Sequence, residues 1–324
     1  MRAAAFCFGR TILYWDTVLL ALAALACALA LCAAFRAVGG RARTLVLLLP
    51  LGTLLSFALA RLLYFYCHSE QYASLSAVLA DSSGASFCLT GAVLGFLLAA
   101  LLSGALCSDD VAALLDCAAP ALALGLAIAR LGALFNDSCR GKLLLSDPRL
   151  VRLHLAVADG DAGYRFAAFG AGAALFVLFF LLLLRRYGRL YSSRRAPKGR
   201  RGDVFLSFLL LCGAEELLVD SVRNDASFFP FNAFISVAQI FAAFFLLAVL
   251  IVYSRRLLRA RGRRFGLLFA WLGWAVGLAA VGIGEYLVQR HGNWQLSCYT
   301  LMSAAILLML GCTAALRRAS EKTE

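Results

Sequence analysis

The 324-residue sequence has few charged side chains: only 15% of its residues are Asp, Glu, Lys or Arg, whereas 63% are hydrophobic. A soluble domain of this length needs far more polar surface, so a soluble enzyme and a disordered chain are both excluded. The hydrophobic residues occur in long unbroken runs and do not alternate with polar ones, which excludes a membrane β-barrel. The composition therefore predicts an all-α, polytopic helical membrane protein.

Several chemical signatures are missing as well. The three histidines, His68, His154 and His291, lack the spacing of metal ligands, and the sequence has neither a G-x-S-x-G motif nor a Gly-rich phosphate loop. The 11 cysteines form no C-x-x-C pair. Most of them lie inside apolar runs, where cysteine behaves as a small buried hydrophobic residue. We therefore expect no cofactor, no metal ion and no disulfide-stabilised secreted fold.

Apolar runs of the length needed to cross a bilayer, about 20 residues, occur nine times. They lie near residues 14–35, 42–66, 85–107, 111–136, 164–184, 203–222, 233–253, 265–286 and 296–316. The segment between the fourth and fifth runs, roughly 137–163, is long and polar enough to form a small element outside the membrane. The sequence thus predicts about nine transmembrane helices.

The basic residues predict the orientation of the chain. Alternate loops carry 20 Lys and Arg residues on one side of the membrane and eight on the other. Loops rich in Lys and Arg stay in the cytoplasm, so the N-terminus is predicted outside and the C-terminus in the cytoplasm. Because topology accounts for most of the net charge of +13, nucleic acid is not expected as a partner.

Ionisable residues inside apolar runs are the strongest candidates for function, because each costs at least about 2.5–3.5 kcal/mol in hydrocarbon. In the predicted orientation, Arg61, Arg130, Glu216, Asp220 and Arg223 lie near the outer surface of the membrane. Guanidinium groups bind phosphate through two hydrogen bonds and keep their charge, so this level suits an anionic lipid headgroup. The alternative is a structural ion pair between Arg130 and Glu216.

Two further carboxylates are interpreted as structural. Asp116 lies at the start of the fourth run and is expected to meet cytoplasmic water. Glu285 lies close to Arg290, His291 and Trp294, and it is expected to anchor its helix at the membrane interface.

Four stretches of the sequence hold most of these residues. ARLGALFNDSCRGK, at the end of the fourth run, contains Arg130, Leu131, Gly132, Asn136, Gly141 and Lys142. EELLVDSVRNDAS contains Asp220, Arg223 and Asp225, FISVAQIFAAFF contains Ser236 and Gln239, and LARLLYFY contains Ala60, Arg61, Leu62 and Tyr64. The order of these stretches along the chain and the apolar runs in which they lie are as informative as the identities of their residues.

These stretches resemble motifs of the prolipoprotein diacylglyceryl transferase family. The first is similar to G-R-L-G-N-F-x-N-x-E-x-x-G-R and the second to R-F-x-x-E-x-x-R-x-D-S. The third is similar to R-x-S-Q-x-L-S and the fourth to G-A-R-L-x-Y. The resemblance covers roughly residues 10–256. It implies a seven-helix membrane core in residues 1–260 and leaves residues 261–324 as a two-helix C-terminal extension.

The family resemblance also implies an activity. Such enzymes move a diacylglyceryl group from phosphatidylglycerol to the signal-peptide cysteine thiol of prolipoproteins, and they release glycerol phosphate at the outer face of the bacterial inner membrane. The implied partners are phosphatidylglycerol, the prolipoprotein signal peptide and membrane lipids. The implied catalytic residues are Arg130, Asp220 and Arg223. The implied substrate-binding residues are Arg130, Arg61, Tyr64, Asn136, Gly141 and Gln239.

Departures from the family pattern leave two other functions open. Thr90 or Cys88 stands where the family has a histidine, and Glu216 stands where it has an arginine. A base would then be a carboxylate, or the substrate thiol would ionise by itself. One alternative is an inactive relative that binds anionic lipid or signal peptides. A small-solute transporter is the other, but it predicts two similar halves that the sequence does not show.

Overall fold

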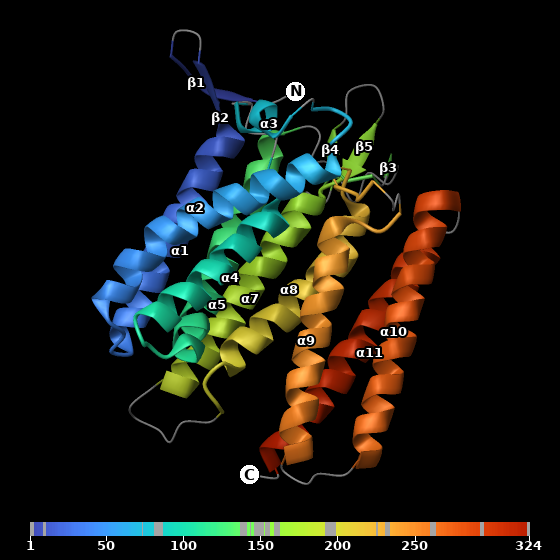
Figure 1. Cartoon of the computed structure of the whole chain (residues 1–324). Helices are drawn as coiled ribbons and strands as arrows, with labels where there is room; N and C mark the ends of the chain where they lie inside the picture. The colour runs from blue at the N-terminus through green and yellow to red at the C-terminus, as the bar shows by residue number, and fades with distance from the viewer. Residues whose placement is uncertain are drawn as a thin grey trace. The chain divides into compact units, whose positions relative to one another are not determined.

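The computed structural model of the chain describes residues 3–8, 11–72, 74–80, 87–136, 141–142, 144–145, 152, 156–158, 163–191, 199–224, 226–230, 234–259, 264–291 and 295–322 (Figure 1). Long helices dominate it, which confirms the predicted all-α class. They are α1 (Trp15–Ala37), α2 (Ala42–Cys67), α4 (Leu89–Leu106), α5 (Val111–Gly132), α7 (Ala168–Tyr191), α8 (Asp203–Val222), α9 (Val237–Arg259), α10 (Arg264–His291) and α11 (Gln295–Lys322). Each of the predicted apolar runs therefore folds into a helix.

Among the described residues, eight helices are candidate membrane spans by length and composition alone, close to the predicted number of about nine. The exception is α8, at the sixth apolar run. It has the length of a crossing helix, but it contains four carboxylates, at Asp203, Glu215, Glu216 and Asp220. These charges make α8 too polar to count as a simple membrane span. The orientation of the chain stays a prediction.

Short elements follow or precede the long helices. The hairpin of β1 (Ala4–Phe8) and β2 (Thr11–Tyr14) precedes α1, and the short helix α3 (Leu75–Ala80) follows α2. The 3₁₀ turn η1 (Ala133–Phe135) ends α5. An antiparallel sheet in the order β3-β5-β4 is formed by β3 (Leu144–Leu145), β4 (Ala156–Ala158) and β5 (Tyr164–Phe166). Most of the predicted outer element at 137–163 lies outside the described residues, and β3 and β4 are parts of it.

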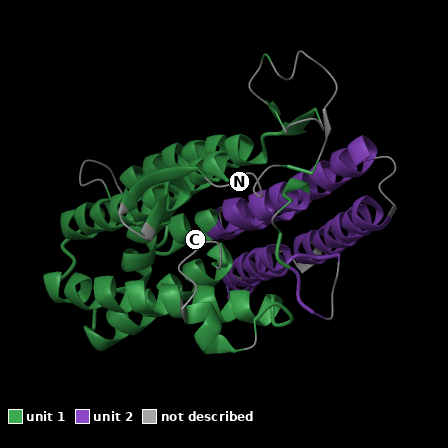
Figure 2. Ribbon diagram, turned by 90° about the horizontal axis from the view of Figure 1, so that it is seen from above, with its two compact units in different colours: residues 1–208, 222–227 green, residues 209–221, 228–324 purple. Residues whose placement is uncertain are grey.

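The chain divides into two compact units (Figure 2). Unit 1 comprises Met1–Phe208 and Val222–Ser227, and unit 2 comprises Leu209–Ser221 and Phe228–Glu324. The boundary therefore passes through α8. The predicted domains, 1–260 and 261–324, describe the extent of the family core, and they stay a prediction.

Close helix packing in unit 1 depends on small residues. In α4, a Cβ atom at Gly91 or Gly95 would collide with the backbone carbonyl of Leu59 or Leu55 in α2. Only glycine therefore lets α2 and α4 approach so closely, as is common between helices in membranes. The most buried helix of the unit is α5, which packs against both α1 and α7.

The strands and α3 gather at one end of unit 1 (Figure 1). The backbone amide of Cys88, just before α4, donates to the carbonyl oxygen of Ala60 in α2, and the amide of Ala3 donates to the carbonyl of Phe135. We call this end, where α2 and α5 finish and α1, α4 and α7 begin, the sheet-bearing end. The loops before α5 and α8 lie at the opposite end.

In unit 2, α10 and α11 form a tightly packed pair. A Cβ atom at Gly277 would approach the side chain of Met309 and one at Gly284 that of Met302, so glycines again permit the contact. The start of α9 is capped by two reciprocal hydrogen bonds. The Gln239 amide donates to Ser236 Oγ at 3.1 Å, and the Ser236 amide donates to Gln239 Oε1 at 3.0 Å. This is a capping box, which fixes where α9 begins.

Candidate functional site

Arg130 lies near the end of α5, at the sheet-bearing end of unit 1. Only 4% of its surface is exposed. Its guanidinium carbon lies 5.9 Å from the ring centroid of Phe176 in α7, at the distance of a cation–π interaction. The neighbouring helices thus hold a permanent positive charge inside the apolar part of the unit, where its interaction with an anion is strong.

Arg61 in α2 is a second buried guanidinium, also 4% exposed. Its guanidinium carbon lies 4.1 Å from the ring centroid of Phe87 and 5.5 Å from that of Phe57. Its Nη1 donates to the carbonyl oxygen of Val78 in α3 at 2.9 Å. Arg61 therefore holds α3 against the end of α2.

Tyr64 lies one helical turn after Arg61 on α2, and His68, the C-cap residue of α2, follows four residues later. The rings of Tyr64 and His68 stack with their centroids 4.1 Å apart and an angle of 18° between their planes. His68 Nδ1 lies 3.1 Å from the Tyr64 carbonyl oxygen. A carbonyl only accepts hydrogen bonds, so Nδ1 is the donor in this contact, and in the neutral ring Nε2 then has the lone pair.

His68 is a candidate site residue that the sequence motifs do not include. The histidines were considered only as metal ligands, and their spacing does not suit that role. The helical spacing of Arg61, Tyr64 and His68 is the signal that could have found it. Of the two predicted replacements for the family histidine, Cys88 is buried beside α2, where its amide bonds to the Ala60 carbonyl at 3.2 Å. Thr90 lies in the first turn of α4 and is half-buried.

The stretches that contain Gly141 and Arg223 lie side by side, although more than 80 residues separate them. Gly141 and Arg223 form an antiparallel β-bridge, and the Lys142 amide donates to the Val222 carbonyl oxygen at 2.7 Å. The Gly141 amide also donates to the Phe166 carbonyl oxygen at 3.0 Å, and a Cβ atom at Gly141 would clash with that oxygen. The position therefore requires glycine.

The remaining predicted site residues are less closely connected. Asn136 follows η1, and its amide donates to the carbonyl oxygen of Ala133. Asp220 is buried on the part of α8 that belongs to unit 2. The side chain of Gln239, also in unit 2, bonds to backbone at both ends, because its Nε2 donates to the Leu217 carbonyl oxygen and its Oε1 accepts from Ser236. Catalytic or binding roles for these residues stay predictions.

The pairing of Arg130 with Glu216 stays a prediction as well. Arg130 belongs to unit 1 and Glu216 to unit 2. Asp225 and Ser138, which also lie in the family-like stretches, fall outside the described residues.

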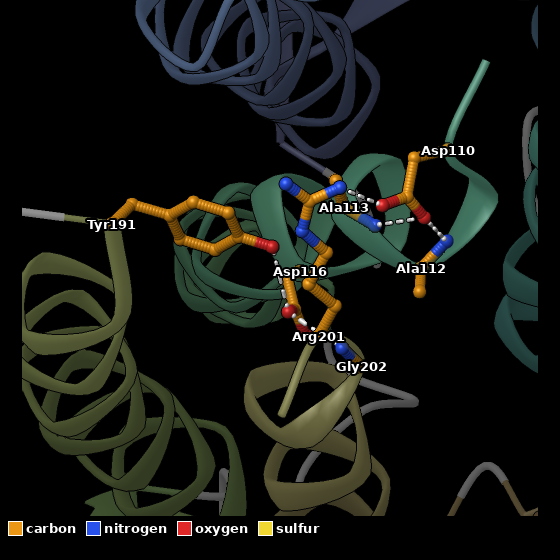
Figure 3. A network of polar contacts seen from close by, with 7 residues as sticks. All are labelled: Asp110, Ala112, Ala113, Asp116, Tyr191, Arg201 and Gly202. Carbon is orange, nitrogen blue, oxygen red and sulfur yellow. Dashed lines mark hydrogen bonds and ion pairs between the residues drawn. The ribbon is translucent and has the colours of Figure 1, made fainter. Parts of the chain in front are cut away.

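The opposite end of unit 1 contains a polar network (Figure 3). Asp116 is fully buried, and its carboxylate accepts from Tyr191 Oη at 3.0 Å, from the Gly202 amide at 2.7 Å and from the Phe205 amide at 2.9 Å. The last two amides lie at the start of α8. The prediction that Asp116 meets cytoplasmic water is therefore wrong: this side chain caps a helix 87 residues further along the chain.

Asp110 caps α5 at the same end. Its carboxylate accepts from the amides of Ala112 and Ala113 at 3.0 and 3.2 Å and forms an ion pair with Arg201. Partial burial raises the pKa of Asp110, but hydrogen bonds from Arg201 and the two amides outweigh it and hold the pKa below its usual value. The carboxylates at this end thus stabilise the fold.

Comparison with known proteins identifies the family. No match was found among curated proteins. The sequence profile of the family described as prolipoprotein diacylglyceryl transferase matches residues 3–255, which is more than three quarters of the chain. Membership of this family implies diacylglyceryl transfer to prolipoprotein cysteine, with phosphatidylglycerol and prolipoprotein as substrates. The chain, which has eight candidate membrane spans among its described residues, belongs to the prolipoprotein diacylglyceryl transferase family.

Proposed function

We propose that this protein transfers diacylglyceryl from phosphatidylglycerol to the signal-peptide cysteine of prolipoproteins, with its site at the sheet-bearing end of unit 1. One observation carries the proposal beyond family membership. The motif stretches that contain Gly141 and Arg223 are joined by a β-bridge. Residues that the family resemblance assigns to one site are therefore brought together by the fold of this chain.

The reaction requires a thiolate and a leaving phosphate. The cysteine thiol loses its proton, and its sulfur attacks the glycerol carbon that bears the phosphate. A carbon–sulfur bond forms while the carbon–oxygen bond breaks. Glycerol phosphate leaves with the electron pair of that bond. Negative charge therefore develops on phosphate oxygens, and a positive group placed there stabilises the transition state.

Arg130 suits the phosphate, because its guanidinium stays charged when buried and offers two parallel donors to a pair of phosphate oxygens. In the proposal, Arg223 joins Arg130 in the catalytic group, and Arg61, Tyr64, Asn136 and Gly141 shape the site of unit 1. Of these, Arg61 and Gly141 act through structure: the first holds α3 and the second allows the approach of Phe166. Asp220 as a catalytic residue and Gln239 as a substrate-binding residue keep the roles that the family resemblance implies.

His68 is our candidate for the base that deprotonates the thiol. Its Nδ1 is occupied by the Tyr64 carbonyl, which leaves Nε2 as the proton acceptor. Thr90 has no comparable basicity, and the thiol of Cys88 is itself an acid. His68 therefore offers a base that the sequence motif lacks.

We also propose the compartment. The predicted orientation places the sheet-bearing end at the outer surface of a bacterial inner membrane, with the C-terminus in the cytoplasm. There the site would meet both the outer leaflet, which supplies phosphatidylglycerol, and signal peptides that have crossed the membrane. Cysteine accessibility labelling of the β1–β2 hairpin in intact cells tests this orientation.

The test of function is complementation in cells depleted of their own transferase. The wild-type chain is expected to restore prolipoprotein lipidation, and Arg130→Ala is expected to fail at equal membrane abundance. Arg259→Ala is the matched control, because Arg259 is an exposed arginine at the end of α9. Failure of the wild type, when present in the membrane, would refute the proposal.

A second candidate is an inactive relative that binds anionic lipid or signal peptides. The acidic Glu216 at the position of a family arginine favours it. This candidate predicts that purified wild type retains phosphatidylglycerol and that Arg130→Ala loses it, with no lipidated product from either. Product formation by the wild type excludes it.

A further inference from the structure

Unit 2 contains a cavity of about 360 Å³ that the transferase motifs do not explain. Leu217 of α8 contributes to its wall, together with the α9 face from Gln239 to Leu247 and the α10 face from Trp274 to Glu285. The volume lies within the range of small-molecule sites. Because α10 begins after the end of the family match at residue 255, the cavity depends on the C-terminal extension of this chain.

The shape of the cavity is long and its lining is apolar. Trp274 and Glu285 lie on one face of α10, and their separation of 11 residue steps corresponds to a length of about 16 Å at the helical rise of 1.5 Å. Phe244 lines the cavity and still exposes 60% of its surface. The cavity therefore opens on the apolar surface of the protein.

One end of the cavity has an unsatisfied polar group. Glu285 is only 2% exposed, so it is not the interfacial anchor that the sequence predicts. Its Oε1 accepts from Gln289 Nε2 at 2.7 Å, whereas its Oε2 has no hydrogen-bond partner within the described residues. A buried carboxylate oxygen without a donor is costly, so a ligand that supplies a donor there is stabilised.

We infer that this cavity binds a neutral glycerolipid, with one acyl chain along α9 and α10 and a free glycerol hydroxyl that donates to Glu285 Oε2. The apolar lining matches a hydrocarbon chain, and the hydroxyl supplies the missing donor. Among the described lining residues there is no Lys or Arg, so an anionic headgroup would find no cation. This inference goes beyond the proposed transfer reaction and does not depend on it.

A signal peptide does not fit the same space. An α-helix with its side chains is 10–12 Å across, so a 16 Å length of it would fill more than about 1,000 Å³. Counted as all the empty space within it, including its opening to the surface, the cavity encloses about 850 Å³, which is less than such a helix needs. An extended acyl chain is narrow enough, which favours lipid over peptide.

The experiment is photolabelling of the full-length protein in nanodiscs with a diacylglycerol that carries a diazirine in one acyl chain. Label in the wild type is expected on peptides from α9 and α10, and excess unlabelled diacylglycerol is expected to compete it away. Label that maps elsewhere overturns the inference. This readout needs no variant and no catalytic turnover.

Two variants sharpen the test. A Cβ atom at Gly282 would meet no atom within 4 Å, so Gly282→Leu fills the cavity without a backbone clash. Gly266→Leu is the matched control, because Gly266 has the same open surroundings on α10 but does not line the cavity. Gly282→Leu is expected to reduce labelling at least tenfold, and Gly266→Leu is expected to retain it.

Glu285→Leu, which removes the acceptor, is expected to reduce labelling about tenfold, the usual effect of losing a hydrogen bond to a charged group. Equal labelling of Gly282→Leu and wild type would overturn the inference. So would competition by phosphatidylglycerol or by a signal peptide as effective as that by diacylglycerol. Arg130→Ala separates the two proposals, since it should lose transfer and keep the label.

Discussion

The two ends of unit 1 both contain charged side chains, but these side chains have different partners. At the opposite end, Asp110 and Asp116 accept hydrogen bonds from backbone amides and cap α5 and α8. At the sheet-bearing end, Arg61 lies against the ring of Phe87, just before α4, and Arg130 lies against the ring of Phe176 in α7. The first arrangement uses charge to satisfy the backbone, and in our proposal the positive charge of Arg130 in the second binds the lipid phosphate. Substitutions at the two ends should therefore impair different properties: stability at the opposite end and transfer at the sheet-bearing end.

The largest expected effect is the loss of transfer in Arg130→Ala. Removing one positioned group that stabilises developing charge costs about 10²–10³-fold in rate. The measurement is the initial rate of transfer to a fluorescent prolipoprotein peptide, with thermal unfolding recorded in parallel. If Arg130→Ala unfolds at as low a temperature as an Asp116 variant, Arg130 is a structural residue, and the proposed difference between the two ends is contradicted.

Asp116→Ala should show the reverse pattern. It removes an acceptor of three hydrogen bonds and leaves two amides at the start of α8 without their cap, so we expect a loss of about 2–4 kcal/mol in stability. The measurement is the denaturation midpoint of the purified protein. The fraction that stays folded should keep its rate of transfer; a folded but inactive variant would contradict a purely structural role.

His68→Asn tests the base. We expect a decrease of about 10²-fold in rate at neutral pH, the usual contribution of a general base. The rate of the variant should then follow the ionisation of the substrate thiol, near pH 8.5, so the difference from wild type should shrink at alkaline pH. A constant difference at every pH would show that His68 only positions Tyr64.

Asp110→Asn should have the smallest effect. The folded pKa of Asp110 is lowered, so its charge contributes stability above the usual pKa of about 4, and this contribution is lost as pH falls through the lowered value. Because the group is partly exposed and solvent screens it, we expect only a few tenths of a kcal/mol. Melting temperatures of wild type and variant should differ at neutral pH and converge below about pH 4; a difference that grows on acidification would refute this sign.

Much of the fold could be predicted from the sequence, because a bilayer requires long apolar helices and leaves a strong signal. The short strands could not, since two or three residues per strand depend on partners such as the Phe166 carbonyl that meets Gly141. At α8 the number of candidate spans differs from the prediction, because the prediction considered the length of this helix without its four carboxylates.

The candidate site residues come from the family resemblance, which assigns Gly141 and Arg223 to one site. No local pattern in the sequence shows that these two residues form a β-bridge. Asp116 was misinterpreted because the helix that it caps lies far along the chain. His68 was overlooked because its spacing from Arg61 and Tyr64 was not considered, and its stacking against Tyr64 is visible only in the structure.

The central claim, transfer of diacylglyceryl at the sheet-bearing end, is tested most directly with purified protein, phosphatidylglycerol vesicles and a prolipoprotein peptide. Mass spectrometry should detect diacylglyceryl on the cysteine sulfur and an equal amount of released glycerol phosphate. Both products should vanish in Arg130→Ala and persist in Arg259→Ala. Absence of product from folded wild type, or equal product from Arg130→Ala, would contradict the account.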